Sequence, residues 1–320
     1  MSDKLTQLFK GKHYSRPRRK PYPKVVALDM DETLGSFIDL EILWSGIFLF
    51  QPDANLDFNS LLDLYPEFLR FGILPILEYL YSKKKHGQCS GIYMYTNNQC
   101  SPSWADRIAS YLHKKIGGHT PLFDKTIHAF KINNKIVEFG RSTHEKTHAD
   151  FIRCTLLPKN TEICFIDNTY YGSMVQNRIY YIKPKAYVHP LKSSEIITRF
   201  MQSSLTKKVC PSPNQYPIFH SFMKNEFIRK GGLPERSSVF PTEKVEIDIL
   251  VAQKMMYHIK EFFYFTQRNA KTRKYQFISN AMTRKRSLST LDSLYQYNHM
   301  PLLWAVLRLT FFETYNNHRT

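Results

Sequence analysis

The sequence predicts an α/β fold in which a parallel sheet is covered by helices on both faces. Between residues 25 and 200, apolar runs of strand length alternate with segments that have the spacing of amphipathic helices. Each predicted strand is a continuous apolar run, which is typical of strands that are buried on both faces. Alternation of strands and helices is the pattern of parallel sheets with helical crossovers.

Two strands and a helix between them are predicted in the first hundred residues. Residues 24–31 (KVVALDMD) are an apolar run, and Pro21 and Pro23 disfavour a helix just before it. Residues 71–87 have helical spacing and end with three lysines and a glycine, which are helix stop signals. Residues 91–98 (GIYMYTNN) form the next predicted strand.

Two further helices and two further strands are predicted before residue 200. Residues 101–118 begin with Ser-Pro and end with lysines and glycines, as capped helices do. A turn is predicted at residues 131–135 and a helix at residues 144–157. Residues 161–168 (TEICFIDN) and 178–184 (RIYYIKP) are predicted strands.

The charge of the chain is uneven and divides it into three parts. The net charge is +18, and residues 1–24 carry eight Lys and Arg against one Asp. Residues 25–200 carry 19 basic and 18 acidic residues, whereas residues 201–320 carry 18 basic and eight acidic residues. We predict a basic arm at 1–24, a globular domain at 25–200 and a basic, mostly helical or disordered extension at 201–320. The basic ends are expected to attract a polyanion or an acidic or phosphorylated protein, in a salt-dependent way.

An intracellular location, in the cytoplasm or the nucleus, is expected. The N-terminus shows no apolar segment of a secretory signal, and the longest apolar stretches are too short or too charged to span a bilayer. We therefore expect no transmembrane segment. The five cysteines form no CxxC pair, which is typical of free thiols in a reducing compartment.

Polar side chains follow three of the predicted strands, at the point where each strand ends. They are Asp29, Asp31, Thr33, Thr96, Asn97, Asp167 and Asn168. In open parallel sheets, binding sites lie beyond the carboxyl ends of the strands. We therefore expect these side chains to meet at one edge of the sheet.

The spacing of the aspartates predicts phosphoryl transfer. Asp29 and Asp31 are two positions apart, so they point to the same side of an extended chain and repel unless a cation or a proton lies between them. Mg²⁺ binds one or two carboxylates together with a substrate phosphate. Asp29 would attack phosphorus, and Asp31 would protonate the leaving oxygen, a transfer worth roughly 10²–10⁴-fold in rate. Thr96 would bind the phosphoryl oxygens, a lysine would neutralise them, and Asp167 with Asn168 would complete the metal shell.

The three motifs resemble those of the haloacid dehalogenase superfamily. The segments LDMDETL, YTNN and FIDN carry the resemblance, and E-T-L with D-N resembles the branch of RNA polymerase C-terminal-domain phosphatases and NLI-interacting-factor-like phosphatases. The segment RFGILPILEYL resembles a helix of that branch that usually opens with Arg-Pro-Gly, although Phe71 replaces the proline. The resemblance covers roughly residues 24–190, and similar proteins occur in large DNA viruses.

The resemblance implies a haloacid-dehalogenase-like, Rossmannoid fold and a Mg²⁺-dependent protein phosphatase. Its substrate would be phosphoserine or phosphothreonine in a protein, such as a peptide like the RNA polymerase tail. Asp29 would be the nucleophile and a Mg²⁺ ligand, and Asp31 the general acid and base whose backbone carbonyl contacts the metal. Asn168 would be a metal ligand, with Asp167 beside it.

The resemblance also implies a set of phosphate-binding residues. Thr96 would bind the phosphate directly, and Thr33 would support the loop and, with Asn97, complete the phosphate-binding surface. Lys146 precedes the last of the three strands at the start of a predicted helix and is the expected phosphate-binding lysine. Lys159, near the far end of that helix, is the alternative.

Three other functions are compatible with the sequence. Residues 144–148 (HEKTH) match H-E-x-x-H, in which two histidines one helical turn apart bind zinc. No further histidine follows within 40 residues, and Glu162 is poorly placed to be the third ligand. The basic ends are also compatible with a nucleic-acid 3′-phosphatase, because related folds do this work. The last alternative is an interaction module whose phosphatase core is inactive.

Overall fold

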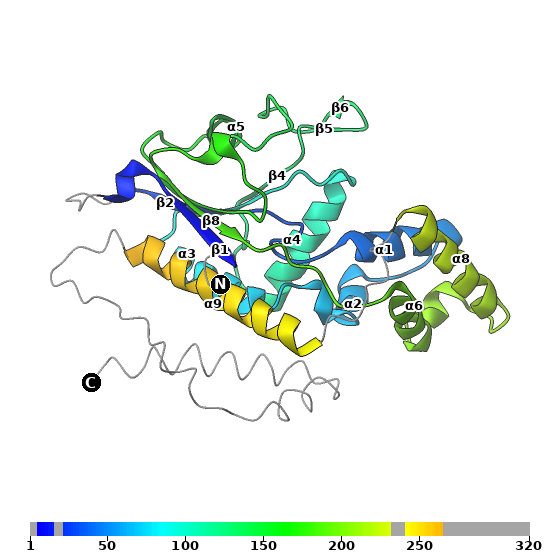
Figure 1. Ribbon diagram of the computed structural model, residues 1–320. Coiled ribbons are helices and arrows are strands. Elements are labelled where there is room, and N and C mark those ends of the chain that lie inside the picture. The colour runs from blue at the N-terminus through cyan, green and yellow to red at the C-terminus, as the bar shows by residue number, and fades with distance from the viewer. Residues whose placement is uncertain (1–4, 16–21, 232–240, 265–320) are drawn as a thin grey trace.

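The computed structural model describes residues 5–15, 22–231 and 241–264, which are built around a six-stranded sheet. The strand order is β1-β8-β7-β2-β3-β4, and Figure 1 shows helices packed around the sheet. All neighbouring pairs are parallel except β1 with β8. The strands are β1 (Thr6–Lys10), β2 (Lys24–Leu28), β3 (Gly91–Tyr95), β4 (Lys125–Ile127), β7 (Glu162–Ile166) and β8 (Ile179–Pro184).

The mostly parallel sheet and its helices confirm the α/β class that was predicted, but one edge strand differs. Strand β1 lies within the predicted basic arm and pairs antiparallel with β8, from Thr6 opposite Pro184 to Lys10 opposite Tyr180. Its apolar residues pack against the cores on the two sides of the sheet. The prediction of an arm is therefore wrong for this segment, because a short edge strand was hidden by the surrounding charge.

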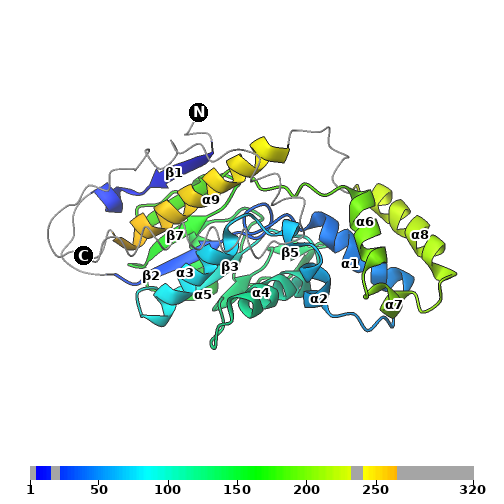
Figure 2. The same ribbon diagram turned by 90° about the horizontal axis from the view of Figure 1, so that it is seen from below.

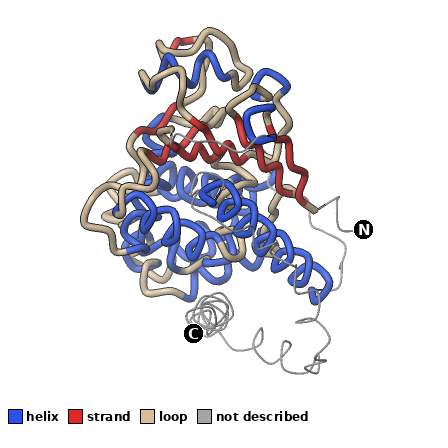
Figure 3. Tube along the Cα trace, turned by 90° about the vertical axis from the view of Figure 1, so that its left-hand side faces the viewer, coloured by secondary structure: helices blue, strands red, loops and turns tan. Residues whose placement is uncertain are grey.

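The helices cover the two faces of the sheet unequally. Figure 3 shows most helices on one side of the strands, and loops with few helical turns on the other. The larger core joins side chains of most helices to one face, whereas α5 is the helix that contributes to the smaller core on the opposite face. The helices are α1 (Ile38–Phe50), α2 (Phe58–Asp63), α3 (Ile73–Lys85), α4 (Pro102–Ile116), α5 (His148–Thr155), α6 (Ser193–Gln202), α7 (Thr206–Val209), α8 (Gln215–Arg229) and α9 (Pro241–Tyr264).

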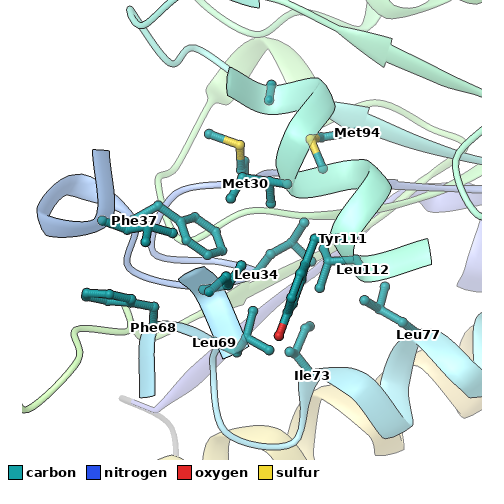
Figure 4. Packing of buried hydrophobic residues seen from close by; sticks show 14 of the residues in the cluster. Met30, Leu34, Phe37, Phe68, Leu69, Ile73, Leu77, Met94, Tyr111 and Leu112 are labelled. Carbon is teal, nitrogen blue, oxygen red and sulfur yellow. The ribbon is translucent and has the colours of Figure 1, made fainter. Parts of the chain in front are cut away.

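The central strand β2 shows how the sheet orients the residues that follow it. Val26 and Leu28 belong to the larger core, and Val25 and Ala27 to the smaller one. Met30, one residue past Asp29, is fully buried in the larger core, and Figure 4 shows it close to Leu34 and Phe37. Burial of Met30 anchors the loop after β2 to the helical side of the sheet.

The predicted boundary at residue 200 does not coincide with the end of the core. Helix α8 packs against α1 and α6, and α9 packs against β8 and β1, as Figure 2 shows for α9 along the edge of the sheet. Met255, Ile259 and Phe262 of α9 are buried in the larger core. The net charge obscured this because it does not register the apolar residues that α8 and α9 bury. Residues 265–320 of the predicted extension lie outside the described part of the chain, as do residues 1–4 and 16–21 of the arm.

The predicted turn at residues 131–135 is a two-stranded hairpin. Strands β5 (Lys131–Ile132) and β6 (Lys135–Ile136) pair antiparallel, and Asn133 and Asn134 join them with φ angles of 49° and 61°. Asparagine tolerates this left-handed conformation in tight hairpins. None of the described helices, including the 24-residue α9, is long and apolar enough to cross a membrane.

Candidate active site

Three neighbouring strands bring the three predicted motifs to one edge of the sheet. Strand β2 lies between β3 and β7, and all three run parallel. Asp29, Thr96 and Asp167 each follow one of these strands directly. Because the chain leaves β2 to form β3 on one side and β7 on the other, the site lies at a topological switch point.

One lysine joins two of these motifs. Lys146 Nζ hydrogen-bonds Oδ1 of Asp29 and lies 2.7 Å from Oδ2 of Asp167. The other oxygen of Asp167 accepts a hydrogen bond from the backbone N–H of Thr169 at 2.8 Å. Lys146 is 1% exposed. Although burial opposes its charge, Asp167 and Asp29 raise the pKa of Lys146 above its ordinary value, so the ammonium form is maintained.

The structure distinguishes the two candidate lysines. Lys146 is buried between the motifs, whereas Lys159 is exposed. Helix α5 is shorter than the helix predicted at 144–157. It begins at His148, where Thr147 caps it by accepting a hydrogen bond from the N–H of Asp150 at 3.0 Å. Lys146 therefore lies in the loop just before the helix.

Arg141 holds that loop in place and was not predicted from the sequence. Its guanidinium group is buried and donates to the carbonyl oxygens of Thr96, His128, His144 and Glu145 at 2.9–3.1 Å. The carbonyls of His144 and Glu145 are thereby withdrawn from helical hydrogen bonding. Arg141 thus links the loop of the second motif to the segment that carries Lys146.

Asp31 has two chemically different oxygens. Oδ2 accepts a hydrogen bond from the side-chain amide of Asn98 at 2.8 Å, and Oδ1 is buried without a hydrogen-bond partner among the described residues. Burial, followed by the charge of Asp29, raises the pKa of Asp31 to about 7. Such a carboxyl group can hold and release a proton near neutral pH. Asn98 was missed in the sequence, although it lies two residues after Thr96.

The loop after Asp31 has a strained turn that is held from several sides. Glu32 has a φ angle of 57°, in the left-handed region that is uncommon for residues other than glycine. Its N–H donates to the carbonyl of Gly35 at 2.6 Å, and its carbonyl accepts from the N–H of Tyr187 at 2.9 Å. Strained backbone that surrounding contacts hold in place is concentrated at functional sites.

Arg70 is the main clamp on this loop. It is buried, and its guanidinium donates to the carbonyls of Thr33 at 2.6 Å and Lys185 at 2.8 Å, and also to that of Glu32. Arg70 opens the segment RFGILPILEYL, which was noted in the sequence, but its contacts with the loop were not predicted. Burial lowers the pKa of Arg70 to about 10, so it remains charged at neutral pH.

Thr33 lies behind the site, where it supports the loops. It is fully buried, accepts from the N–H of Asn168 at 3.0 Å and donates to Oδ1 of Asn168 at 2.9 Å. The amide nitrogen of Asn168 in turn donates to Glu32 at 2.9 Å. Burial separates the hydroxyl of Thr33 from the surface and both of its hydrogen bonds go to Asn168, so its contact with phosphate stays a prediction.

Thr96 and Asn97 complete the second motif. The hydroxyl of Thr96 accepts from the N–H of Asn98 at 3.0 Å, which stabilises a tight turn after β3. The side-chain amide of Asn97 donates to the hydroxyl of Tyr171 at 3.0 Å and so joins the second motif to the third. The rings of Tyr171 and Tyr95 each lie 5.6 Å from Lys146 Nζ and help to enclose it.

Two of the three aspartates of the site share one buried cation. Asp29 and Asp167 both pair with Lys146, and burial and the charge of Asp29 raise the pKa of Asp167 in spite of the lysine. The described residues contain no group of three His, Cys, Asp or Glu side chains that could hold a metal ion. Mg²⁺ does not need such a group, because one or two carboxylates, waters and a substrate phosphate suffice. Asp29 and Asp167, which lie on either side of Lys146, provide the two carboxylates of this requirement.

The segment HEKTH does not form the zinc-binding arrangement. His144 is exposed in the loop before α5, and His148 is the first residue of the helix. The pattern requires both histidines on one face of one helix. The alternative of a zinc protease therefore finds no support in the described structure.

No protein-family model, curated protein or solved structure matches this chain.

Proposed function

We propose that this chain is a Mg²⁺-dependent phosphomonoester hydrolase with a haloacid-dehalogenase-like fold, acting through an aspartyl-phosphate on Asp29. The observation that carries the proposal is the arrangement of Asp29 and Asp167 around the buried ammonium group of Lys146, at the ends of neighbouring parallel strands. A carboxylate nucleophile beside a fixed positive charge suits attack on a phosphate group.

The proposed reaction has two steps. In the first step, a carboxylate oxygen of Asp29 bonds to phosphorus as the bond from phosphorus to the leaving oxygen breaks. The electron pair stays with the leaving oxygen, which takes a proton from Asp31. In the second step, Asp31 takes a proton from a water molecule whose oxygen bonds to phosphorus as the bond from phosphorus to Asp29 breaks. The electron pair stays with the Asp29 carboxylate, and inorganic phosphate leaves. The raised pKa of Asp31 suits both roles.

The residues that would hold Mg²⁺ are Asp29, Asp167, Asn168 and the backbone carbonyl of Asp31. When bound, Mg²⁺ would neutralise part of the charge of the phosphate. Lys146 would keep the nucleophile oriented and supply a second positive charge. Thr96 and Asn97 would bind the phosphoryl oxygens beside it.

The proposed substrate is phosphoserine or phosphothreonine in a protein, for example a peptide like the RNA polymerase tail. This part of the proposal rests on the resemblance of the three motifs. If the substrate were instead a nucleic-acid 3′-phosphate, high salt would abolish the preference of the protein for it sooner than a preference for a peptide. Counterions compete with basic residues for the backbone phosphates of a nucleic acid.

The experiment that tests the proposal is release of phosphate from p-nitrophenyl phosphate by the full chain, with Mg²⁺ and with EDTA. The expected result is release that depends on Mg²⁺ and that Asp29→Asn abolishes without changing the circular dichroism spectrum. Asparagine has the shape of aspartate but cannot form the phosphoenzyme. Absence of release from the folded wild-type protein would favour an inactive interaction module, and appreciable activity of Asp29→Asn would overturn the assignment of the nucleophile.

A further inference from the structure

We infer that Tyr171 is a further phosphate-binding residue, whose hydroxyl group donates to an oxygen of the substrate phosphate, an inference that rests on the proposed function. Tyr171 lies in the loop after β7, shortly after Asn168. Its ring lies 5.6 Å from Lys146 Nζ, and its hydroxyl oxygen lies 3.0 Å from the side-chain nitrogen of Asn97. Tyr171 is therefore next to two of the residues that would bind the phosphate.

Tyr171 lies on the more open side of Lys146. Lys146 itself is 1% exposed, and the ring of Tyr95, which is equally far from its Nζ, is fully buried. The side chain of Tyr171, in contrast, is partly exposed. A phosphate group that enters from solvent can therefore contact Tyr171 and Lys146 together, whereas Tyr95 lies behind the ammonium group.

The hydrogen bond between Asn97 and Tyr171 has a preferred direction. Asn97 Oδ1 is buried and has no hydrogen-bond partner among the described residues. If the amide were turned round, its NH₂ group would lie in that place, and two unpaired donors would replace one unpaired acceptor. The less costly orientation has the NH₂ group toward Tyr171, so the hydroxyl oxygen of Tyr171 accepts from it.

This direction leaves the hydroxyl hydrogen of Tyr171 available. A phenol keeps its proton at neutral pH, and it can donate one hydrogen bond while its oxygen accepts another. The oxygen accepts from Asn97, and no group in the described part of the chain accepts the hydrogen. A non-bridging oxygen of a phosphate held between Lys146 and Asn97 would accept it, and hydrogen bonds to such charged groups are the strong ones.

Binding of inorganic phosphate tests this role without any turnover. Tyr171→Phe keeps the ring beside Lys146 and removes only the hydroxyl group. We expect the Kd of the full chain for inorganic phosphate, measured by calorimetric titration with Mg²⁺, to rise about tenfold or more, as for a lost hydrogen bond to a charged group. For p-nitrophenyl phosphate, kcat/KM should fall by a similar factor.

Tyr170→Phe is the matched control. Tyr170 precedes Tyr171, is 50% exposed, and stacks on the ring of Tyr181 with the ring centroids 6.1 Å apart. Removal of its hydroxyl group should leave the Kd for inorganic phosphate and kcat/KM unchanged. Both variants keep their rings, so their circular dichroism spectra and melting temperatures should match those of the wild type.

The Asn97→Ala background separates a direct contact from an effect through Asn97. If the hydroxyl group of Tyr171 donates to phosphate, Tyr171→Phe should raise the Kd further in this background. If the hydroxyl group only holds Asn97 in place, Tyr171→Phe should have no further effect once the amide is gone. This second result would overturn the inference.

The outcomes distinguish this inference from the proposed function. The inference alone would be overturned if the wild type hydrolyses p-nitrophenyl phosphate and Tyr171→Phe raises the Kd for inorganic phosphate less than expected, or no more than Tyr170→Phe does. The proposed function alone would be overturned if Tyr171→Phe weakens phosphate binding in a chain that hydrolyses no phosphate ester. A folded wild-type chain that neither binds inorganic phosphate nor hydrolyses the ester would overturn both.

Discussion

The ammonium nitrogen of Lys146 lies 2.7 Å from Oδ2 of Asp167, although the two residues belong to different elements of the fold. Lys146 precedes α5 on the less covered face of the sheet, and Asp167 follows β7. The same ammonium group also bonds Asp29 after β2. One side chain thus joins two strand ends, and its loss leaves two buried carboxylates without their common partner.

Replacing Lys146 with methionine should lower kcat for p-nitrophenyl phosphate by about 10²–10³-fold, the size typical of removing one group that stabilises transition-state charge. Methionine retains the apolar stem but not the cation. Lys159→Met is the matched control, since Lys159 is exposed and should retain activity. Steady-state kinetics with Mg²⁺ measure both variants, and equal losses would contradict the role of Lys146.

Replacing Arg70 with methionine should lower the free energy of unfolding by several kcal/mol. A buried carbonyl that loses its donor costs about 1–3 kcal/mol, as that of Thr33 would, and the partly buried carbonyls of Glu32 and Lys185 also lose the donor that Arg70 supplies. Arg70→Lys should recover only part of the loss, because an ammonium group lacks the planar fork. Urea denaturation provides the measurement.

The control for Arg70 is Arg153→Met on the exposed side of α5. The Arg153 side chain is half exposed and pairs with the buried Asp150, whose two oxygens also accept hydrogen bonds from Ser142, so the loss of this half-exposed pair should cost only about 0–1 kcal/mol. Finding that Arg70→Met is as stable as this control would show that the clamp on the loop is dispensable.

Without Mg²⁺, ionisation of the site should destabilise the protein as the pH rises from about 4 to about 7. Burial and Asp29 raise the pKa of Asp31 from 3.8 to about 7 and raise that of Asp167 as well. Between these values the folded state binds more protons than the unfolded state, so the contribution of such a group to stability falls with increasing pH. Thermal melting in EDTA measures this effect.

The contribution of Asp31 appears in the comparison with Asp31→Asn. This variant removes one of the two titrating groups, so its melting temperature should fall less between about pH 4 and about pH 7 than that of the wild type. Parallel curves for the two proteins would contradict the raised pKa of Asp31. Addition of Mg²⁺ should stabilise the wild type more at the higher pH, because protons compete with the cation for the carboxylates.

Two truncations should behave differently. Removing residues 268–320 should spare hydrolysis of p-nitrophenyl phosphate and weaken retention on heparin, because α9 ends at Tyr264 and the removed segment is basic. Removing residues 241–320 should unfold the protein, because Met255, Ile259 and Phe262 of α9 are buried. Each such side chain contributes about 1.5–3 kcal/mol by burial, against a total stability of about 5–15 kcal/mol. Loss of hydrolysis of p-nitrophenyl phosphate when only residues 268–320 are removed, measured beside the circular dichroism spectrum, would contradict the first of these two expectations.

Local sequence pattern was sufficient to predict an element when the residues of that element alone carry the signal. The runs at 24–31, 91–98, 161–168 and 178–184 contain the strands β2, β3, β7 and β8, whose continuous apolar residues require burial on both faces. The helix at 101–118 is also present, with Gly117 at its end in the left-handed conformation that its φ angle of 63° shows. Helix α1 was missed, because its residues are apolar all around and show no helical periodicity.

The sequence by itself determined which strands are buried and which polar side chains follow them, because burial and turn formation are properties of short segments. The tertiary structure alone decided that β2 lies between β3 and β7, and that Lys146 rather than Lys159 reaches their ends. It also decided the contacts of Arg70, Asn98 and Arg141, which join loops far apart in the sequence. Such contacts depend on how the strands are ordered and how the loops pack, and no local spacing of residues encodes that order.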